Sequence, residues 1–246
     1  MIELKNKTVI VTGSSRGLGK RVALEFSKCG ANVVVNYNSN AEEAESVVQQ
    51  IRLGGGNAIA VKADVSHCDG AETLYESTFQ SFGKVDVLVN NAGTMITKFL
   101  QDFSEDEFDR QFSINVKGVF LMMRLAAENL EPKGRIINIS STTSRLMMPS
   151  YAVYSATKAA VEQMTRVFAK EIGAKGITVN SVLPGPMNTE LFLKDKPQEL
   201  IDKIAGLTAF GRIGEVQDII PIILFLASDE SQWITGQSFG VNGGMA

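Results

Sequence analysis

The amino-acid sequence predicts an α/β fold in which helices cover both faces of a doubly wound parallel sheet. Apolar runs of strand length alternate with helical patterns along the chain, and turn residues separate them. The runs are also apolar throughout, as in the segment from Val85 to Val89. Strands that helices cover on both faces have no side in water, so this composition indicates a buried parallel sheet.

Seven segments match this strand pattern, and each is bounded by turn residues or by a helical pattern. We predict strands at Thr8–Thr12, Val33–Tyr37, Ala58–Lys62, Val85–Asn90, Arg135–Ser140, Thr178–Leu183 and Ser238–Val241.

The segments between the strands carry helix start and stop signals. Gly30 follows Cys29 and Gly54 follows Leu53, as expected for residues that end helices. Ser104 stands three residues before Glu107 and predicts a capping box at a helix start. A further helix is predicted from Tyr151 to Ile172.

No linker or change of composition divides the chain, and 246 residues suit a single α/β domain, so we expect one domain over residues 1–246. The stretch from Pro184 to about Gly214 is predicted to be irregular. Long loops in compact domains are usually lids or binding loops. We therefore expect residues 187–211 to form a substrate loop that closes over the site.

Composition excludes several classes of function. The formal net charge is only -3 and no long Lys/Arg cluster is present, which argues against a nucleic-acid partner. The segment Met1–Lys7 leaves no room for a signal peptide, and the longest apolar run, Ile219–Ala227, is too short to span a bilayer. We expect no membrane partner and a cytoplasmic location.

The metal-ligating residue types are few. Cys29 and Cys68 suit a reducing compartment and have no metal-binding spacing. His67 is the only histidine, and we interpret it as an ordinary loop residue ahead of a helix. We predict no metal site.

A glycine turn follows the first predicted strand, with Gly13, Gly17 and Gly19 in the segment Thr12–Gly19. Glycines allow a tight strand-to-helix turn and the close approach of a phosphate, and the next helix supplies oriented N–H groups. The spacing departs from the usual dinucleotide fingerprint, so by itself it also fits a glycine-rich connector.

The end of the second predicted strand bears on the choice of coenzyme. A carboxylate there would bind the ribose hydroxyls of NAD, but this chain has no carboxylate until Glu42. Arg16 in the glycine turn offers a guanidinium to a 2′-phosphate. The neutral residues at the end of the strand and just after it complete our prediction of an NADP(H) site: Asn36, Tyr37, Asn38 and Ser39. The alternative for Arg16 is a solvated surface arginine.

The chain resembles the short-chain dehydrogenase/reductase family over most of its length. The matching segments are Thr12–Gly19, Asp64-Val65, Asn90–Gly93, Asn115, Ser141, Tyr154–Lys158, Pro184-Gly185 and Val241–Gly244. The resemblance implies a Rossmann-type sheet and a catalytic set made of Asn115, Ser141, Tyr154 and Lys158. It also implies that the cofactor contacts Gly13, Ser15, Arg16, Gly17, Leu18, Gly19, Asp64, Val65, Asn91, Ala92, Gly93, Tyr154, Lys158, Pro184, Gly185, Met187 and Thr189.

Within that resemblance each catalytic residue has an expected role. Tyr154 and Lys158 lie four residues apart, on one face of a helix. A free phenol has a pKa of about 10, and a nearby ammonium and the positive oxidised nicotinamide both favour the phenolate, so we expect Tyr154 to be a tuned proton donor. Ser141 is expected to stabilise the substrate oxygen and Asn115 to hold a water in a proton relay. Ser140 and Tyr151 lack the family's offsets.

The predicted function is NADPH-dependent reduction of a carbonyl group. The segments expected to form the pocket are apolar and favour a hydrophobic ketone, aldehyde or 3-oxoacyl thioester. The pocket residues are Met95, Met147, Met148, Met187 and Phe192, beside Leu146 and Leu191. The alternative is that several of these methionines pack in the core or between subunits.

Several questions stay open at this level. The chain resembles both 3-oxoacyl-(acyl-carrier-protein) reductases and reductases of free ketones. An acidic carrier protein would bind best to a basic patch beside the site. The candidate residues for such a patch are Lys133, Arg135, Lys170 and Lys175. A non-catalytic NADP(H) sensor or scaffold, and an oxidative alcohol or sugar dehydrogenase, would use the same fold. The family commonly forms homotetramers, whose interface could include Val161, Met164, Val167 and Phe168, unless these face the sheet.

Overall fold

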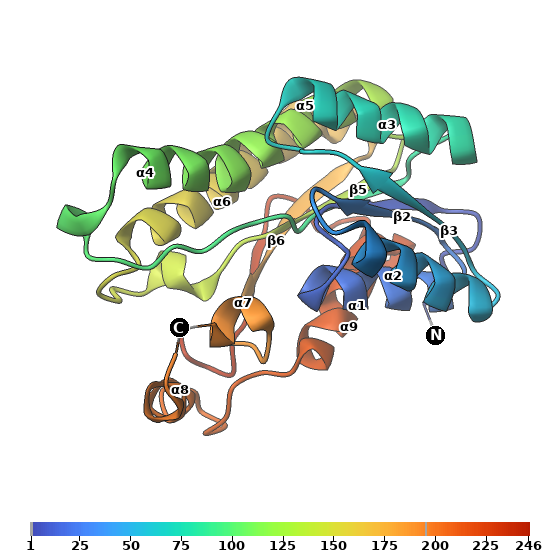
Figure 1. Ribbon diagram of the computed structural model, residues 1–246. Helices are drawn as coiled ribbons and strands as arrows, with labels where there is room; N and C mark the ends of the chain where they lie inside the picture. The colour runs from blue at the N-terminus through green and yellow to red at the C-terminus, as the bar shows by residue number, and fades with distance from the viewer. Residues whose placement is uncertain (1, 195) are drawn as a thin grey trace.

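In the part of the chain that the structure describes, seven parallel strands form one sheet, and helices cover both of its faces (Figure 1). A computed structural model describes residues 2–194 and 196–246. All seven predicted strands are confirmed, although β4 begins at Val87 rather than Val85. Their bounds are β1 Thr8–Val11, β2 Asn32–Tyr37, β3 Asn57–Lys62, β4 Val87–Asn90, β5 Arg135–Ile139, β6 Thr178–Pro184 and β7 Ser238–Val241.

The helices form two layers. One layer contains α3 (Cys68–Phe82), α4 (Glu105–Phe112), α5 (Gly118–Asn129) and α6 (Ala152–Ile172), and the other contains α1 (Gly17–Lys28), α2 (Ala41–Leu53) and α9 (Val216–Ala227) (Figure 1). The predicted capping box of Ser104 and Glu107 begins α4. Short 3₁₀ turns occur at Leu100–Asp102, Thr142–Arg145, Gly173–Lys175 and Asp229–Ser231, and a π turn, Ser113–Lys117, joins α4 to α5.

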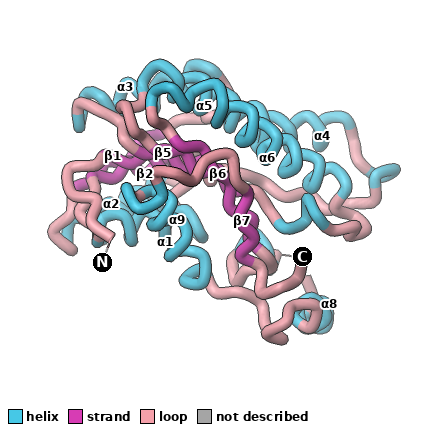
Figure 2. The backbone as a smooth tube through the Cα atoms, turned by 180° about the vertical axis from the view of Figure 1, so that it is seen from behind, coloured by secondary structure: helices cyan, strands magenta, loops and turns pink. Residues whose placement is uncertain are grey.

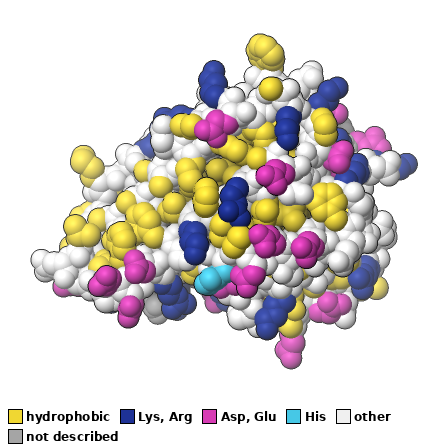
Figure 3. Space-filling view, turned by 90° about the horizontal axis from the view of Figure 1, so that it is seen from above, with side chains coloured by type: hydrophobic (Ala, Val, Ile, Leu, Met, Phe, Trp, Pro, Cys, Tyr) yellow, Lys and Arg dark blue, Asp and Glu magenta, His cyan; other side chains and the backbone are white. Residues whose placement is uncertain are grey.

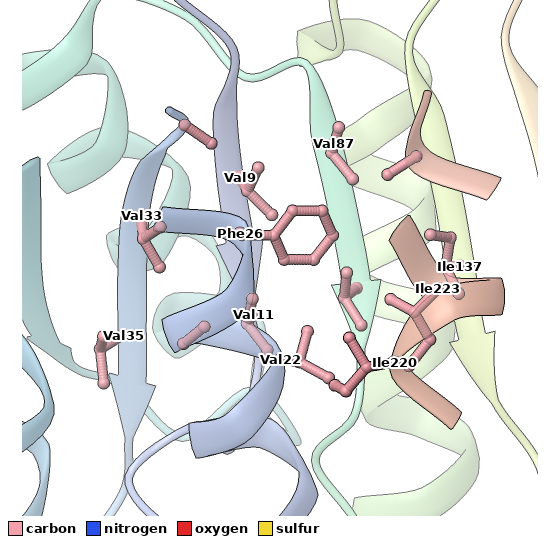
Figure 4. Packing of buried hydrophobic residues seen from close by; sticks show 14 of the residues in the cluster. Val9, Val11, Val22, Phe26, Val33, Val35, Val87, Ile137, Ile220 and Ile223 are labelled. Carbon is pink, nitrogen blue, oxygen red and sulfur yellow. The ribbon is translucent and has the colours of Figure 1, made fainter. Parts of the chain in front are cut away.

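The side chains of each strand alternate between two apolar cores. On β1, Val9 and Val11 belong to the core beneath α1 and α9, whereas Ile10 belongs to the core beneath α3, α5 and α6. Figure 4 shows the first core, where Phe26 of α1 and Ile223 of α9 meet the valines of the sheet. Burial on both faces is the physical reason why the strands are apolar at every position.

The strand order is β3-β2-β1-β4-β5-β6-β7, so the winding of the chain reverses between β1 and β4. In doubly wound sheets this reversal opens a crevice at the carboxyl ends of the strands, where ligands bind. The glycine turn follows β1, and the segment Asn91–Gly93 follows β4. The fold therefore places both predicted cofactor segments at one crevice.

The expectation of an irregular stretch from Pro184 to Gly214 is wrong in part. Two short helices, α7 (Glu190–Leu193) and α8 (Gln198–Ala205), form within it. Thr189 caps the first of them, since its Oγ1 accepts a hydrogen bond from the Phe192 N–H at 3.3 Å. Asp195, which belongs to the predicted substrate loop, lies outside the described residues.

The chain terminus packs against the end of this helical segment, near α8 (Figure 2). The N–H of Ala209 donates to the carbonyl of Gly243 at 2.7 Å. Throughout residues 2–194 and 196–246, no helix combines the length and apolar character that a bilayer span requires.

Candidate active site

The glycine turn is tied to the end of β4 by Thr12. Its Oγ1 accepts hydrogen bonds from the N–H groups of Asn91 and Ala92, both at 2.9 Å. Gly13 lies so close that a Cβ there would stand 2.9 Å from the Ala92 Cα, and its φ of +60° also favours glycine. The two segments on either side of the crevice are thus held as one unit.

The same turn leaves room for a phosphate. A Cβ on Gly19 would lie 2.5 Å from the Gly13 carbonyl oxygen, whereas a Cβ on Gly17, with φ +56°, would meet nothing within 4 Å. Helix α1 begins at Gly17 and has no acidic residue in its first turn. The N–H groups at the start of α1 and the open space beside Gly17 fit a dinucleotide pyrophosphate. The residues that would hold it are Ser15, Gly17, Leu18 and the backbone around them.

Asn36 was predicted to meet the cofactor, and its side chain has a different task. It is buried, its Oδ1 accepts the Gly13 N–H at 3.0 Å, and its Nδ2 donates to the Ala63 carbonyl at 3.0 Å. Asn91 acts similarly, because its Nδ2 donates to the carbonyls of Thr12 and Gly13 at 2.9 Å. Both amide side chains therefore brace the turn, and the cofactor contacts expected of Asn36 and Asn91 stay predictions.

The groups after β2 stay open to solvent. Asn38 and Ser39 are exposed, and Tyr37 is half-buried. The Arg16 side chain is 66% exposed and its Nη1 lies 3.5 Å from an Oε2 of Glu190 in α7. An exposed ion pair of this kind contributes little stability, so the guanidinium is free to turn toward a phosphate.

Asp64 and Val65 follow β3. Burial opposes ionisation of Asp64, but hydrogen bonds from Ser66 and the neighbouring His67 outweigh it and lower the pKa of this carboxyl group. Its Oδ2 accepts a hydrogen bond from the Asn38 side chain at 3.3 Å. Val65 is buried beside Gly118 at the start of α5.

Ser141, Tyr154 and Lys158 come together where β5 ends against α6. Ser141 follows β5 and donates a hydrogen bond to the Tyr154 hydroxyl, and the Lys158 Nζ lies 5.7 Å from the centroid of the Tyr154 ring. The Lys158 ammonium donates to the Ile139 carbonyl at 2.8 Å. All three side chains are buried, as a site that excludes water requires.

The ionisation of the pair differs from the expectation. Burial raises the pKa of Tyr154 to about 12, although the hydrogen bond from Ser141 acts in the opposite direction. Burial also lowers the pKa of Lys158 to about 8. In the protein alone, loss of hydration dominates both groups, so the ammonium by itself does not bring the pKa of the tyrosine below its usual value. The effect expected of the oxidised nicotinamide stays a prediction. A phenol with a raised pKa is still a proton donor.

Asn115 lies in the π turn between α4 and α5, a feature often found at functional sites. Its Oδ1 accepts the Thr94 N–H at 2.8 Å, and its Nδ2 donates to the Thr94 carbonyl at 2.9 Å and to the Thr157 Oγ1 at 3.1 Å. A Cβ on Gly93 would lie 3.4 Å from the Asn115 Oδ1 and 3.7 Å from the Lys158 Nζ. Asn115 is thus in the predicted constellation, while its role in a water relay stays a prediction.

The predicted substrate pocket divides into three groups. Met95, Met148 and Phe192 are half-buried. Met147 is fully exposed, and Met187 is buried in the core with α1 and α9, so neither contributes its side chain to a pocket in this chain. The prediction is wrong for these two because an apolar residue in a loop can equally project outward or fill the core.

Pro184 is the last residue of β6, and Gly185 follows it. Gly185 approaches the terminal segment so closely that a Cβ would lie 2.7 Å from the Asn242 Cα. The segment Pro184-Gly185 therefore lies directly against the segment Asn242–Gly244 in the fold.

The predicted basic patch is not beside this site. Arg135 is buried at the amino end of β5, where its Nε donates to the Ser228 carbonyl at 3.0 Å and its guanidinium pairs with Asp229 at 3.3 Å. Lys133 and Lys175 lie at the same edge, where their backbones are hydrogen bonded. Parallel strands put this edge opposite Ser141, so these residues do not support a carrier protein docking at the site.

Sequence reasoning did not identify the residues that orient the site from behind. Thr12, Ser14 and Thr157 are buried and bind neighbouring backbone or Asn115. Two features of the sequence could have identified them. Thr12 and Ser14 lie in the glycine turn, and Thr157 lies between Tyr154 and Lys158.

Comparisons with known proteins agree with this geometry. Residues 13–246 match a family model described as enoyl-(acyl carrier protein) reductase. An NADPH-dependent aldehyde reductase-like chloroplastic protein of Arabidopsis thaliana is 40% identical, covering 99% of this chain and 95% of the relative. A short-chain type dehydrogenase/reductase of Picea abies is 41% identical, covering 98% and 93%. The solved angucycline C-6 ketoreductase LanV with bound NADP is 34% identical at a TM-score of 0.93, covering 99% and 96%.

Proposed function

Because this chain belongs to the short-chain dehydrogenase/reductase family of oxidoreductases, we propose that it reduces a hydrophobic ketone or aldehyde with NADPH. The observation that carries the proposal is the hydrogen bond from Ser141 to Tyr154, with Lys158 against the tyrosine ring, at the crevice of the glycine turn. This arrangement provides an oriented proton donor beside the expected position of a nicotinamide and a carbonyl carbon.

NADPH, when bound, supplies the hydride. The Tyr154 phenol gives its proton to the carbonyl oxygen, and the Ser141 hydroxyl turns to stabilise the negative charge that develops there. The Lys158 ammonium favours the phenolate left behind, while its bond to the Ile139 carbonyl fixes its position. Burial of these groups strengthens each of their interactions by excluding water.

The preference for NADP(H) is supported by charge. No carboxylate follows β2 before Glu42, and the exposed Arg16, Asn38 and Ser39 can approach a 2′-phosphate. NADP is also bound in the LanV structure. Arg16→Ala should weaken NADPH binding and leave NADH binding unchanged. Arg21→Ala, inside α1, should change neither. Equal affinity of the unaltered protein for NADH and NADPH would refute this preference.

Turnover tests the reaction. Purified protein should oxidise NADPH with aromatic and aliphatic ketones, and Tyr154→Phe should lose at least about 100-fold in kcat. Tyr151→Phe is the matched control, since that ring stands 6.4 Å from Tyr154 on the same helix turn. Undiminished turnover in Tyr154→Phe would contradict the assignment. Binding of NADPH without turnover on any ketone would indicate a sensor or scaffold, and turnover only in the oxidative direction would indicate a dehydrogenase.

The substrate class can be divided further. A free ketone is favoured over a carrier-bound 3-oxoacyl thioester, because the basic residues named for a carrier protein lie at the opposite edge of the sheet. Faster turnover of an acyl carrier thioester than of simple ketones would reverse this order. We expect residues 1–246 to work as one domain in a reducing compartment such as the cytoplasm, with residues 187–211 as the substrate loop.

A homotetramer is part of the same proposal. Figure 3 looks onto the layer of α3 to α6 and shows apolar side chains gathered between charged ones. Phe120 and Val167 are each 47% exposed there, whereas Val161 is buried against the sheet and Met164 and Phe168 pack beside that core. A second copy of this chain would cover the exposed pair. Phe120→Asp combined with Val167→Asp should reduce the mass measured by light scattering.

A further inference from the structure

Glu162 is a buried carboxylate on α6, one helical turn beyond Lys158, and only 8% of its surface is exposed. A buried carboxylate is costly unless hydrogen-bond donors surround it. Its Oε1 accepts hydrogen bonds from the Ser140 hydroxyl at 3.1 Å and the Ser144 hydroxyl at 2.5 Å. Its Oε2 lies 3.7 Å from the Arg145 guanidinium.

These partners stand on both sides of Ser141 in the chain. Ser140 follows the last residue of β5 and directly precedes Ser141, and Ser144 belongs to the 3₁₀ turn after it. The Ser140 hydroxyl also lies 3.2 Å from the Lys158 carbonyl. One carboxylate therefore fastens the segment that carries Ser141 to the helix that carries Tyr154 and Lys158.

We infer that Glu162 is a positioning residue, which holds Ser141 in hydrogen bond with Tyr154. The inference rests on the proposed function. The Ser141 oxygen accepts from the Thr143 N–H at 3.3 Å and from the Thr143 hydroxyl at 3.1 Å, both within the turn that Glu162 fastens. A hydroxyl has one proton and two lone pairs, so these contacts occupy the lone pairs and leave the Ser141 proton available to the Tyr154 hydroxyl. Without the carboxylate, the turn is no longer held to α6, and the Ser141 hydroxyl is no longer oriented toward Tyr154.

Three variants test the role. Glu162→Leu removes both acceptors and should lower kcat for ketone reduction about 10-fold, because small displacements of catalytic groups are costly, while NADPH affinity stays unchanged. Glu162→Gln keeps an oxygen for Ser140 and Ser144 and should restore most of the activity. Glu171→Leu is the matched control, an exposed glutamate near the end of the same helix.

A double-mutant cycle separates positioning from loss of stability. If Glu162 acts through Ser141, then Glu162→Leu should add almost no further loss in a Ser141→Ala background. A full additional loss there would overturn the inference while leaving the proposed function intact. Wild-type turnover in Ser141→Ala would instead refute the proposed role of the serine. Should Glu162→Leu fail to fold, Ser144→Ala provides the same cycle, with a smaller loss that must also vanish in the Ser141→Ala background.

Discussion

Replacement of Asn36 by alanine tests whether this side chain braces the glycine turn. The substitution removes an acceptor from the Gly13 N–H at 3.0 Å and a donor from the carbonyls of Ala63 at 3.0 Å and Val61 at 3.4 Å. The side chain is 2% exposed, so water does not readily replace these bonds. At about 1 kcal/mol for each of the three, we expect the free energy of unfolding to fall by about 3 kcal/mol.

For a domain of this size, that loss corresponds to a decrease in Tm of about 6 to 12 °C. Thermal unfolding followed by circular dichroism measures it, and titration of NADPH fluorescence should show weaker binding, because Gly13 borders the phosphate site. Asn38→Ala is the matched control: it lies two residues further along, is exposed, and should leave the Tm unchanged. If Asn36→Ala had the same Tm as this control, the bracing role would be refuted.

Three further outcomes are expected. Gly19→Ala should lower the stability of the fold and abolish NADPH binding, because the new Cβ would lie 2.5 Å from the Gly13 carbonyl oxygen. Gly173→Ala is the control: its Cβ would meet nothing within 4 Å and its φ is -57°, so its thermal unfolding should be unchanged. Arg135→Met should lower the free energy of unfolding by about 2 kcal/mol in urea titrations, because the buried carbonyls of Ser228 and Gly134 lose their donor. It should leave kcat unchanged, since Arg135 lies at the edge of the sheet opposite Ser141, and a fall in kcat would contradict that separation. Burial lowers the pKa of Lys158 from 10.5 to about 8, so the unfolded chain binds the extra proton between these values and stability should rise with pH across this window. Lys158→Met should flatten that rise in Tm measured from pH 8 to 10, and an identical slope in both proteins would argue against a buried ammonium.

Most of the correct predictions came from local sequence patterns. The seven strands, the glycine turn after β1 and the four-residue spacing of Tyr154 and Lys158 depend on residues close together in the chain, where periodicity and backbone preference act directly. The predicted irregular stretch failed for a related reason. Helices of four and eight residues, such as α7 and α8, are too short to show a clear period.

The direction of individual side chains was less predictable. The Asn36 side chain braces the turn, the Met187 side chain fills the core, and Arg135, which was named for a basic surface patch, is buried. Amides, thioethers and guanidinium groups suit either environment, so residue type does not distinguish them. The partners that decide their positions come from distant parts of the chain.

Sequence by itself determined the alternation of strands and helices, because this follows from short-range periodicity. The reacting groups followed from the resemblance of the motifs to a known family. Tertiary structure decided which polar groups face a ligand and which hold the site from behind. Glu162 shows the reason: it meets Ser140 from 22 residues away, and only the packing of α6 on β5 brings the two together in a place that water does not reach.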